Sequence, residues 1–245
     1  HLDELMTLTD AVMVARGDLG VELPPEKVPG LQKKIVKLCR KWGKPVVVAT
    51  QMLDSMVHSP APTRAEASDV ATAVYDSADA VMLSAETAAG EYPIESVDMM
   101  NRIILEAEGD EAYQASTDSK QNVVEPTVSD AITLAARQVA ETVNANCIVT
   151  YTTSGETTLR AARERPTVPI LCVTSSLSTA RRMAIAWGVH SVHIDQEERF
   201  STVVKRAVDI AETQGFASSG DHIVITAGVP MGKSGSTNVL RIERI

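Results

Sequence analysis

The stretch "AVMVARGDLG", residues 11–20, joins a continuous apolar run to a turn that carries charge and glycine. The pattern returns twice: "VVVA" from Val46 leads into Thr50, and "AVML" from Ala80 leads into Ser84. The three runs begin 35 and then 34 residues apart, with helix-like stretches between them. Apolar strands that alternate with helices are typical of βα units on a buried parallel sheet. The first part of the chain is therefore predicted to be α/β.

Polar residues follow each predicted strand. Gly17 and Asp18 come after the first strand, Thr50 after the second and Ser84 after the third. The carboxyl ends of parallel strands are where α/β barrels and open α/β sheets place their active sites. A carboxylate, two hydroxyls and backbone N–H groups on one edge suit a divalent cation and an anionic substrate. For each residue taken alone, an Asx turn or a helix cap is the open alternative.

The composition indicates an ordinary globular protein. Its 245 residues are 44% hydrophobic and 22% charged, enough for one large domain or two. The net charge of −9 argues against a general nucleic-acid binder. With neither an apolar stretch near the roughly 20 residues of a membrane span nor a signal-peptide pattern, the sequence predicts a cytoplasmic protein outside the membrane. Cys39, Cys147 and Cys172 are predicted to be reduced core thiols, because they are far apart and odd in number.

The charge is distributed unevenly along the chain. Residues 1–112 hold 19 acidic side chains against 10 Lys and Arg, a net −9, whereas residues 113–245 hold 13 of each. The shift falls near "EGDEAYQASTDSKQN", a polar segment poor in aliphatic residues. We therefore predict two domains, residues 1–112 and 113–245.

The second part is predicted to be an α/β domain with a mostly parallel sheet. Residues 127–143, "TVSDAITLAARQVAETV", have helical spacing, with Thr127 or Ser129 as the N-cap. The apolar stripe of this helix is expected in the core and consists of Val128, Ile132, Ala135, Val139 and Val143. Apolar runs at residues 147–151, 169–173, 188–194 and 222–226 follow, separated by helix-like segments.

Two loops of the second part carry groups suited to phosphate. In "TTSGETT", residues 152–158, a turn leads into a helix whose first N–H groups can bind an anion, and helix capping is the alternative. The segment "AGVPMGKSG", residues 227–235, is close to a P-loop, but a P-loop leads into a long helix and further strands. Eleven residues follow Ser234, and their pattern predicts a last β-strand. Together with Arg181 and Arg182, the two loops favour a phosphate pocket over a nucleotide hydrolase.

Two long segments resemble pyruvate kinase of bacterial type: "MVARGDLGVELPPEKVPGLQKKIVKLCRKWGKPVVVATQMLDSM" and "PTRAEASDVATAVYDSADAVMLSAETAAGEYP". The resemblance extends over the whole chain. It implies the last three βα units of a (β/α)₈ TIM barrel, followed by a C-terminal α/β domain. It also implies phosphoryl transfer from phosphoenolpyruvate to ADP in glycolysis, with Mg²⁺ or Mn²⁺ and K⁺ as cofactors and a homotetramer as the assembly.

The resemblance implies roles for the residues at the strand ends. Asp18 is expected to bind the divalent cation, and Gly17 and Asp18 to contact the substrate through their backbone. Thr50 is expected to lie over the substrate near the face where the enolate is protonated, with Ser84 as a member of the proton relay. Another segment, "TRAE", resembles positions near the active-site rim and a subunit contact through Arg64 and Glu66.

An allosteric site for a phosphorylated effector, a sugar phosphate or AMP, is also implied by the resemblance. It places Thr153, Ser154, Gly155, Thr157, Thr158, Lys233, Ser234 and Gly235 in that site. Glu156 stands where some members of the family carry a basic residue. Its negative charge disfavours a bisphosphate.

The strand before "AVMVA" carries two further catalytic groups in the family, a lysine that contacts the transferring phosphoryl group and a glutamate that binds the metal. Neither is in this sequence, and the lid and the monovalent-cation site are also missing. Three βα units cannot close a barrel of eight, so an exposed apolar sheet face is expected. The chain alone is therefore predicted to be inactive. The alternative function is a catalytically incomplete fragment that binds the effector and assembles into oligomers.

Overall fold

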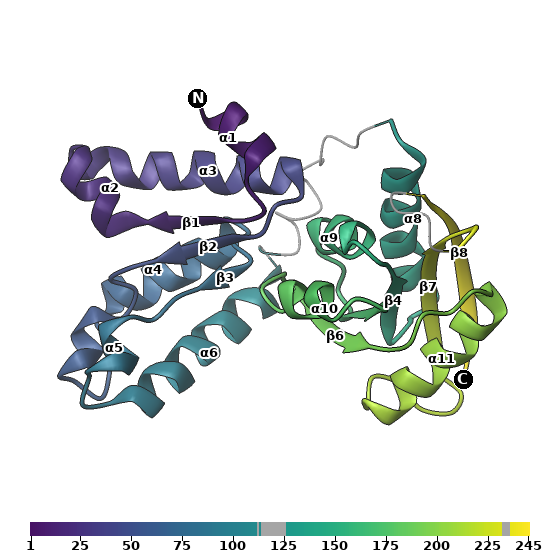
Figure 1. Cartoon of the computed structure of the whole chain (residues 1–245). Coiled ribbons are helices and arrows are strands. Elements are labelled where there is room, and N and C mark those ends of the chain that lie inside the picture. Colours follow the sequence, from purple (N-terminus) through teal and green to yellow (C-terminus); the bar gives the residue numbers. More distant parts are fainter. Residues whose placement is uncertain (112, 114–125, 232–235) are drawn as a thin grey trace. The chain divides into compact units, whose positions relative to one another are not determined.

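Two compact units, His1–Gln121 and Asn122–Ile245, make up the structure, a computed structural model (Figure 1). It describes residues 1–111, 113, 126–231 and 236–245. Each unit combines helices with a sheet of parallel strands. Most residues of the connecting segment lie outside the described ranges, so the domain boundary between residues 112 and 113 stays a prediction.

The described part of the first unit contains a three-stranded parallel sheet in the order β1-β2-β3. Its strands, β1 (Val12–Ala15), β2 (Val46–Ala49) and β3 (Ala80–Val81), confirm the three predicted runs. The helices are α1 (Leu2–Leu8), α2 (Arg16–Glu22), α3 (Val28–Trp42), α4 (Arg64–Tyr75), α5 (Ala85–Ala88) and α6 (Pro93–Gly109), with 3₁₀ turns η1 (Pro25–Lys27) and η2 (Asp54–Val57). The alternation of strands and helices is that of a partial barrel.

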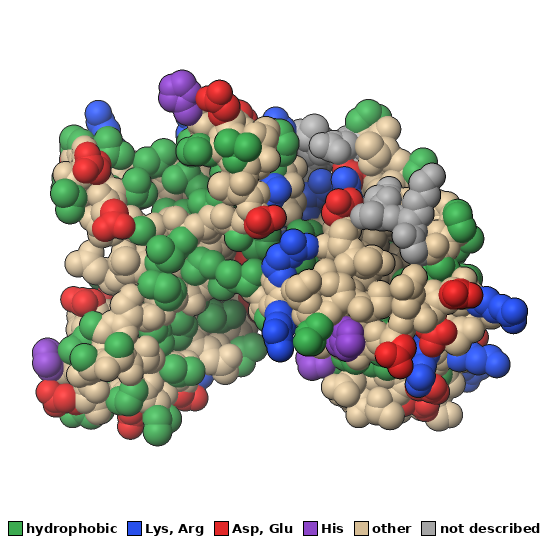
Figure 2. Space-filling view, in the orientation of Figure 1, with side chains coloured by type: hydrophobic (Ala, Val, Ile, Leu, Met, Phe, Trp, Pro, Cys, Tyr) green, Lys and Arg blue, Asp and Glu red, His purple; other side chains and the backbone are tan. Residues whose placement is uncertain are grey.

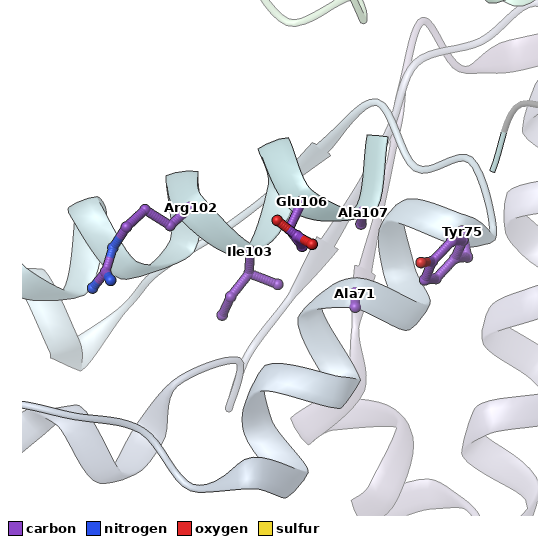
Figure 3. Close-up of a pocket in the computed structure, with 6 residues that line it drawn as sticks. All are labelled: Ala71, Tyr75, Arg102, Ile103, Glu106 and Ala107. Atoms are coloured by element: carbon purple, nitrogen blue, oxygen red, sulfur yellow. The ribbon is translucent and has the colours of Figure 1, made fainter. Parts of the chain in front are cut away.

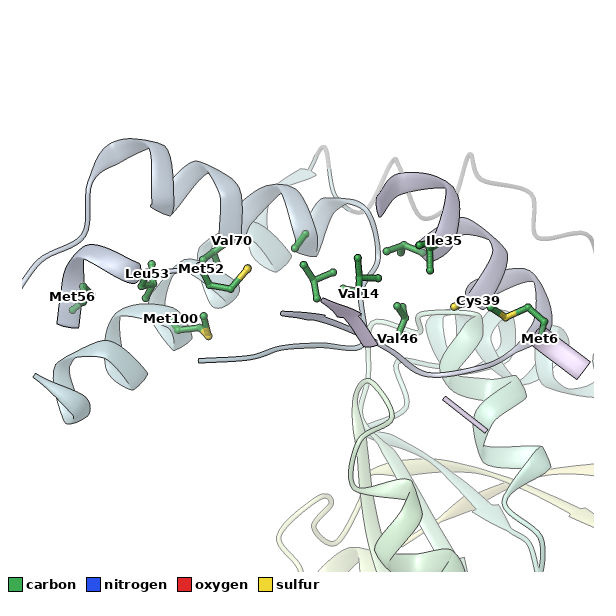
Figure 4. Close-up of a cluster of buried hydrophobic side chains, with 14 residues drawn as sticks. Met6, Val14, Ile35, Cys39, Val46, Met52, Leu53, Met56, Val70 and Met100 are labelled. Carbon is green, nitrogen blue, oxygen red and sulfur yellow. The ribbon is translucent and has the colours of Figure 1, made fainter. Parts of the chain in front are cut away.

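One face of this sheet packs into a core of aliphatic and methionine side chains (Figure 4). Val14 and Val48, opposite each other on β1 and β2, are buried there with Ile35 of α3. The other face is more open, because the side chain of Met13 on β1 is 56% exposed. Figure 2 shows green hydrophobic atoms over much of the visible face of this unit. Met13 is thus an exposed apolar side chain on this face, and the wider apolar face expected of an open sheet stays a prediction.

The second unit, within residues 126–231 and 236–245, has a five-stranded sheet in the order β6-β5-β4-β7-β8. β4 (Cys147–Tyr151), β5 (Ile170–Thr174), β6 (Val189–His193) and β7 (His222–Gly228) are parallel, and β8 (Thr237–Arg244) pairs antiparallel with β7. The helices are α8 (Val128–Thr142), α9 (Glu156–Arg163), α10 (Leu177–Met183) and α11 (Phe200–Thr213). The mostly parallel sheet and the last β-strand are confirmed.

The helix α8 begins at one of the two predicted caps, but its buried face differs from the predicted one. Thr127 is the N-cap, accepting a hydrogen bond from the Asp130 N–H at 3.3 Å, as one of the two predicted caps. The predicted stripe is wrong at Val128, which is 64% exposed, and its remaining members are only half-buried. The buried positions are Asp130, Thr133, Ala136 and Ala140. Val139 and Val143 pack against the apolar cluster that includes Ala136 and Ala140.

The three cysteines are free and buried, as predicted. Loss of hydration on burial raises the pKa of the Cys39 thiol to about 11 and that of the Cys147 thiol to about 12. Cys172 shifts in the same direction for the same reason. Such thiols stay protonated and unreactive at neutral pH. None of the helices in the described residues is both long enough and apolar enough to span a bilayer.

Candidate functional site

The carboxyl edge of the first sheet brings two of the predicted residues into direct contact. β1 leads into Gly17, and β2 leads into Thr50. The backbone N–H of Gly17 donates a hydrogen bond to Thr50 Oγ1 at 2.8 Å. The Thr50 hydroxyl in turn donates to the Ala49 carbonyl at 2.6 Å. The hydroxyl therefore joins the ends of two neighbouring strands.

The backbone at Thr50 and the next residue, Gln51, is left-handed, with φ of 71° and 54°. Few non-glycine residues adopt this conformation, and a β-branched threonine is among the least suited to it. Backbone strain of this kind concentrates at functional sites, where surrounding contacts maintain it. The strain at Thr50 supports a functional reading of this edge over a simple turn.

Arg16, the residue after β1, supplies such contacts. Its guanidinium donates to the carbonyls of Ala49, at 3.3 Å, and Thr50, at 2.7 Å. It also pairs with Asp69 of α4, with 2.6 Å between Nη1 and Oδ2. The sequence pattern predicts no role for Arg16, because its partners lie 33 or more residues away. The only indication in the sequence is a cation directly after a buried strand.

Asp18 lies in the first turn of α2, with its side chain exposed at the same edge. Within the described ranges, no three His, Cys, Asp or Glu side chains gather at a point that could hold a metal ion. Magnesium sites commonly use one or two carboxylates, with substrate phosphates and water as the remaining ligands. Asp18 fits such a site as one ligand of several.

Ser84 follows β3 and precedes α5, and its hydroxyl does not cap that helix. Its backbone N–H instead donates to Oε2 of Glu86 at 2.7 Å. The other oxygen of this 2%-exposed carboxylate accepts the Leu53 N–H at 3.2 Å. Glu86 thus ties the loop after β3 to the loop after β2. The loop continues to Gly90, where a Cβ would lie 2.5 Å from the Glu86 carbonyl oxygen, so only glycine fits.

Glu66 has a structural role at the start of α4. It forms a capping box with Thr63, whose hydroxyl accepts the Glu66 N–H. Its carboxylate also accepts the Ser55 N–H at 2.7 Å and the Ser55 hydroxyl at 2.6 Å. Desolvation alone would raise the pKa of Glu66, but the hydrogen bonds from Ser55 and Thr63 outweigh it and lower the pKa. Arg64 occupies the first helical position beside this cap and is exposed.

The pocket shown in Figure 3 lies away from this edge. Its volume is about 240 Å³, and it is lined by Ala71, Tyr75, Arg102, Ile103, Glu106 and Ala107. Tyr75 ends α4 and precedes β3, which places the pocket toward the amino end of that strand. None of the predicted site residues lines it.

In the second unit, the turn at residues 152–155 leads into α9 as predicted. Thr152 Oγ1 accepts the Gly155 N–H at 3.0 Å, and Gly155 is the N-cap with φ of 91°. The two threonines at the start of α9 are buried, and their hydroxyls have protein partners. Thr157 Oγ1 lies 2.5 Å from Thr237 Oγ1, and Thr158 Oγ1 lies 2.7 Å from Thr150 Oγ1. These contacts anchor α9 to the sheet.

In this turn Thr153 is exposed and Ser154 is half-buried. Their carbonyls accept hydrogen bonds from α10, at 2.8 Å from the Thr179 hydroxyl and 2.5 Å from the Arg182 guanidinium. The other predicted effector residues, Lys233, Ser234 and Gly235, lie outside the described residues. The first residue of β8, Thr237, contacts Thr157, so the described end of that loop lies beside the start of α9.

Together, the two units define an α/β protein whose polar residues gather at the carboxyl edge of a parallel sheet, where such proteins keep their active sites. A family model for the pyruvate kinase barrel domain matches residues 1–97, and one for the pyruvate kinase alpha/beta domain matches residues 130–243. The chain belongs to the pyruvate kinase family, whose members are phosphotransferases of glycolysis.

Individual relatives agree with this membership. A pyruvate kinase of Methylorubrum extorquens is 51% identical over 99% of this chain and 51% of its own length. One of Geobacillus stearothermophilus is 45% identical over 100% of this chain and 42% of its own length. The crystal structure of a pyruvate kinase from Cryptosporidium parvum, 38% identical, matches with a TM-score of 0.90 over 99% of this chain and 48% of that one. The chain therefore spans about half the length of these relatives.

Proposed function

We propose that this chain supplies part of the catalytic edge and the effector domain of a pyruvate kinase, which transfers a phosphoryl group from phosphoenolpyruvate to ADP. The observation that carries the proposal is the Gly17–Thr50 hydrogen bond at the strand edge of a chain that belongs to this family. The whole protein is proposed to be a cytoplasmic homotetramer. Its small-molecule partners are then phosphoenolpyruvate, ADP and a phosphorylated effector.

The contact between Gly17 and Thr50 suggests how the substrate binds. An anionic oxygen that accepts the Gly17 N–H has to replace the Thr50 hydroxyl, which now accepts it at 2.8 Å. To donate to the same substrate, the Thr50 hydroxyl would also turn away from the Ala49 carbonyl, which now accepts its proton at 2.6 Å. In this proposal Gly17 and Thr50 bind the substrate as a pair. Ser84, on the loop tied to the Thr50 loop through Glu86, serves the proton relay.

Asp18 is proposed as one protein ligand of the divalent cation, Mg²⁺ or Mn²⁺. When bound, such an ion neutralises charge that develops on the transferred phosphoryl group. Oxygens of the substrate and water complete its coordination, together with the glutamate that the family resemblance places outside this chain. The K⁺ site is likewise assigned to no residue of this chain. Catalysis is therefore proposed to need groups beyond these 245 residues.

Measuring pyruvate formation tests these roles. The chain alone is expected to give no turnover above background, and Mg²⁺-dependent turnover that Asp18→Ala abolishes would contradict this expectation. A chimera in which residues 1–245 replace the matching half of the Methylorubrum extorquens relative is expected to be active. In that chimera, Asp18→Ala should lower kcat/KM on the order of a thousandfold, because a bound metal offsets several kcal/mol of charge. Near-normal activity refutes the ligand assignment. Asp98→Asn, at an exposed ion pair on α6, is the matched control.

A second candidate is an effector-binding and assembly fragment without catalysis. It is supported by the match of residues 130–243 to the pyruvate kinase alpha/beta domain. The half-buried Ser154 and the N–H groups at the start of α9 would bind a phosphate together with Lys233. The buried hydroxyls of Thr157 and Thr158 would shape the turn rather than contact the ligand.

Titration calorimetry with AMP, ribose 5-phosphate and fructose 1,6-bisphosphate tests this site on the chain itself. Lys233→Ala should weaken binding, whereas Lys205→Ala, an exposed lysine on α11, should not. If no ligand binds the parent chain, or the Lys233 variant binds equally well, the site assignment fails. If the bisphosphate binds tightest, the inference from Glu156 is wrong instead.

A further inference from the structure

The guanidinium of Arg16 contacts three successive carbonyls of the turn after β2. Nε donates to the Ala49 carbonyl at 3.3 Å, and Nη2 donates to those of Thr50, at 2.7 Å, and Gln51, at 3.3 Å. The same Nη2 lies 2.9 Å from Met52 Sδ. One side chain thus follows the backbone of this turn from its first residue to its last.

This turn needs a donor of that shape. Because Thr50 and Gln51 are both left-handed, the backbone conformation is one that side chains with a Cβ disfavour. The carbonyls also converge, and partly buried acceptors without donors are destabilising. A planar guanidinium presents several N–H groups in a fixed fork, whereas a lysine ammonium is a single point of charge. Arginine is therefore the side chain suited to hold this turn.

Asp69 fixes the other side of the guanidinium. Its carboxylate lies 2.7 Å from Nη1 through Oδ1, and the side chain of Arg16 is 13% exposed. Asp69 belongs to α4, whose start is held by the capping box of Thr63 and Glu66. The position of the guanidinium is thereby tied to a helix rather than to the loop alone.

We propose that Arg16 is a positioning residue: by holding Thr50 and Gln51 in the left-handed conformation, it aims the Thr50 hydroxyl at the Gly17 N–H. Arg16 and Gly17 are adjacent, so the end of β1 supplies both the guanidinium that holds the turn and the N–H that donates to the Thr50 hydroxyl. The functional meaning rests on the proposed function, in which Gly17 and Thr50 bind the substrate as a pair. The geometric claim can be tested without any substrate.

Hydrogen exchange of the Gly17 amide, followed by NMR on the ¹⁵N-labelled chain, reports this contact directly. In Arg16→Lys, the Gly17 amide should exchange about tenfold faster, which corresponds to about 1.4 kcal/mol. The amide of Val48, a buried residue of β2, should keep its rate. Thr50→Val removes the acceptor of this hydrogen bond and should by itself accelerate hydrogen exchange of the Gly17 amide. Arg16→Lys added to Thr50→Val should then produce little further acceleration, because Arg16 acts through Thr50.

Three outcomes would overturn the proposal. They are an unchanged Gly17 rate in Arg16→Lys, equal acceleration of Gly17 and Val48, and fully additive effects in the double variant. Arg102→Lys, at an exposed ion pair on α6, is the matched control and should leave Gly17 unaffected. If Arg16→Lys does not fold, Asp69→Asn provides the test, with a smaller acceleration expected and an unchanged rate counting against the proposal. Since no substrate is present, failure of the proposed reaction would not alter these rates.

Discussion

Replacing Gly155 by alanine should destabilise the second unit through two separable effects. Gly155 has φ of 91°, outside the range that side chains with a Cβ adopt readily. An added Cβ would also lie 2.8 Å from Met183 Cε, 3.0 Å from Met183 Sδ and 3.2 Å from Thr179 Cγ2. Met183 is 1% exposed, so its displacement disturbs the surrounding core.

The size of the effect follows from these two contributions. A left-handed conformation costs a residue with a Cβ roughly 1–2 kcal/mol. Overpacking of a filled core costs about 1–3 kcal/mol more. Alanine also lowers the conformational entropy of the unfolded chain, which stabilises the folded state by about 0.4–1 kcal/mol. The expected loss in the free energy of unfolding is therefore about 2–4 kcal/mol.

The assay uses urea unfolding followed by the fluorescence of Trp187. The chain has two tryptophans, so in a Trp42→Phe background the tryptophan fluorescence comes from Trp187 of the second unit. Trp187 stacks under the Arg165 guanidinium at 4.8 Å, and unfolding of the unit removes that environment. Gly220→Ala is the matched control, because Gly220 has φ of 100° and nothing within 4 Å of the added Cβ.

The control isolates the backbone contribution, about 1 kcal/mol after the unfolded-state correction. Gly155→Ala should exceed it by the cost of displacing Met183. Equal losses for the two variants would refute the steric argument, and a loss near zero for both would refute the conformational one as well.

Three further results are expected. Asp130→Asn should destabilise the second unit by about 2 kcal/mol, measured by the same fluorescence, because the buried Arg163 loses the carboxylate now 2.8 Å away and keeps that of Glu164 at 3.1 Å. A loss below about 1 kcal/mol would contradict this. The stability of that unit should decrease as pH rises from 9 toward 12, because the Cys147 thiol, whose pKa is raised in the folded state, loses its proton at lower pH in the unfolded chain. Cys147→Ala should reduce this loss of stability, measured by urea titrations at pH 8 and 10. Thr63→Ala should cost the first unit about 1 kcal/mol by removing the N-cap of α4, with no change in the second unit's midpoint.

The strands were predictable because their sequences are continuous and apolar. Such runs are buried on both faces of a parallel sheet, so composition and length identify them without tertiary information. The N-cap of α8 was also local, since Thr127 needs only the N–H three residues on. These features depend on residues close together in the sequence.

The missed features depend on partners far away in the sequence. The buried face of α8 includes Asp130, which an apolar pattern excludes, because the arginines that pair with it lie 30 and 33 residues later. The hydroxyl of Thr157 meets that of Thr237, 80 residues on, so a predicted ligand group is already bonded within the protein. Arg16 likewise finds its carbonyls 33 to 35 residues away.

Gly90 limits which substitutions evolution can accept beside the carboxyl edge of the first sheet. A Cβ at this position would lie 2.5 Å from the Glu86 carbonyl oxygen. Because that oxygen belongs to the backbone, no side-chain rotamer change can relieve the clash. A codon change there would displace α5, and with it the Glu86 carboxylate that joins the two loops, although Gly90 is not itself one of the predicted site residues. Drift at Ala85 or Thr87, which are exposed, carries no such penalty. Among descendants of this gene, a lineage that lost Gly90 should be one in which the edge is no longer under selection.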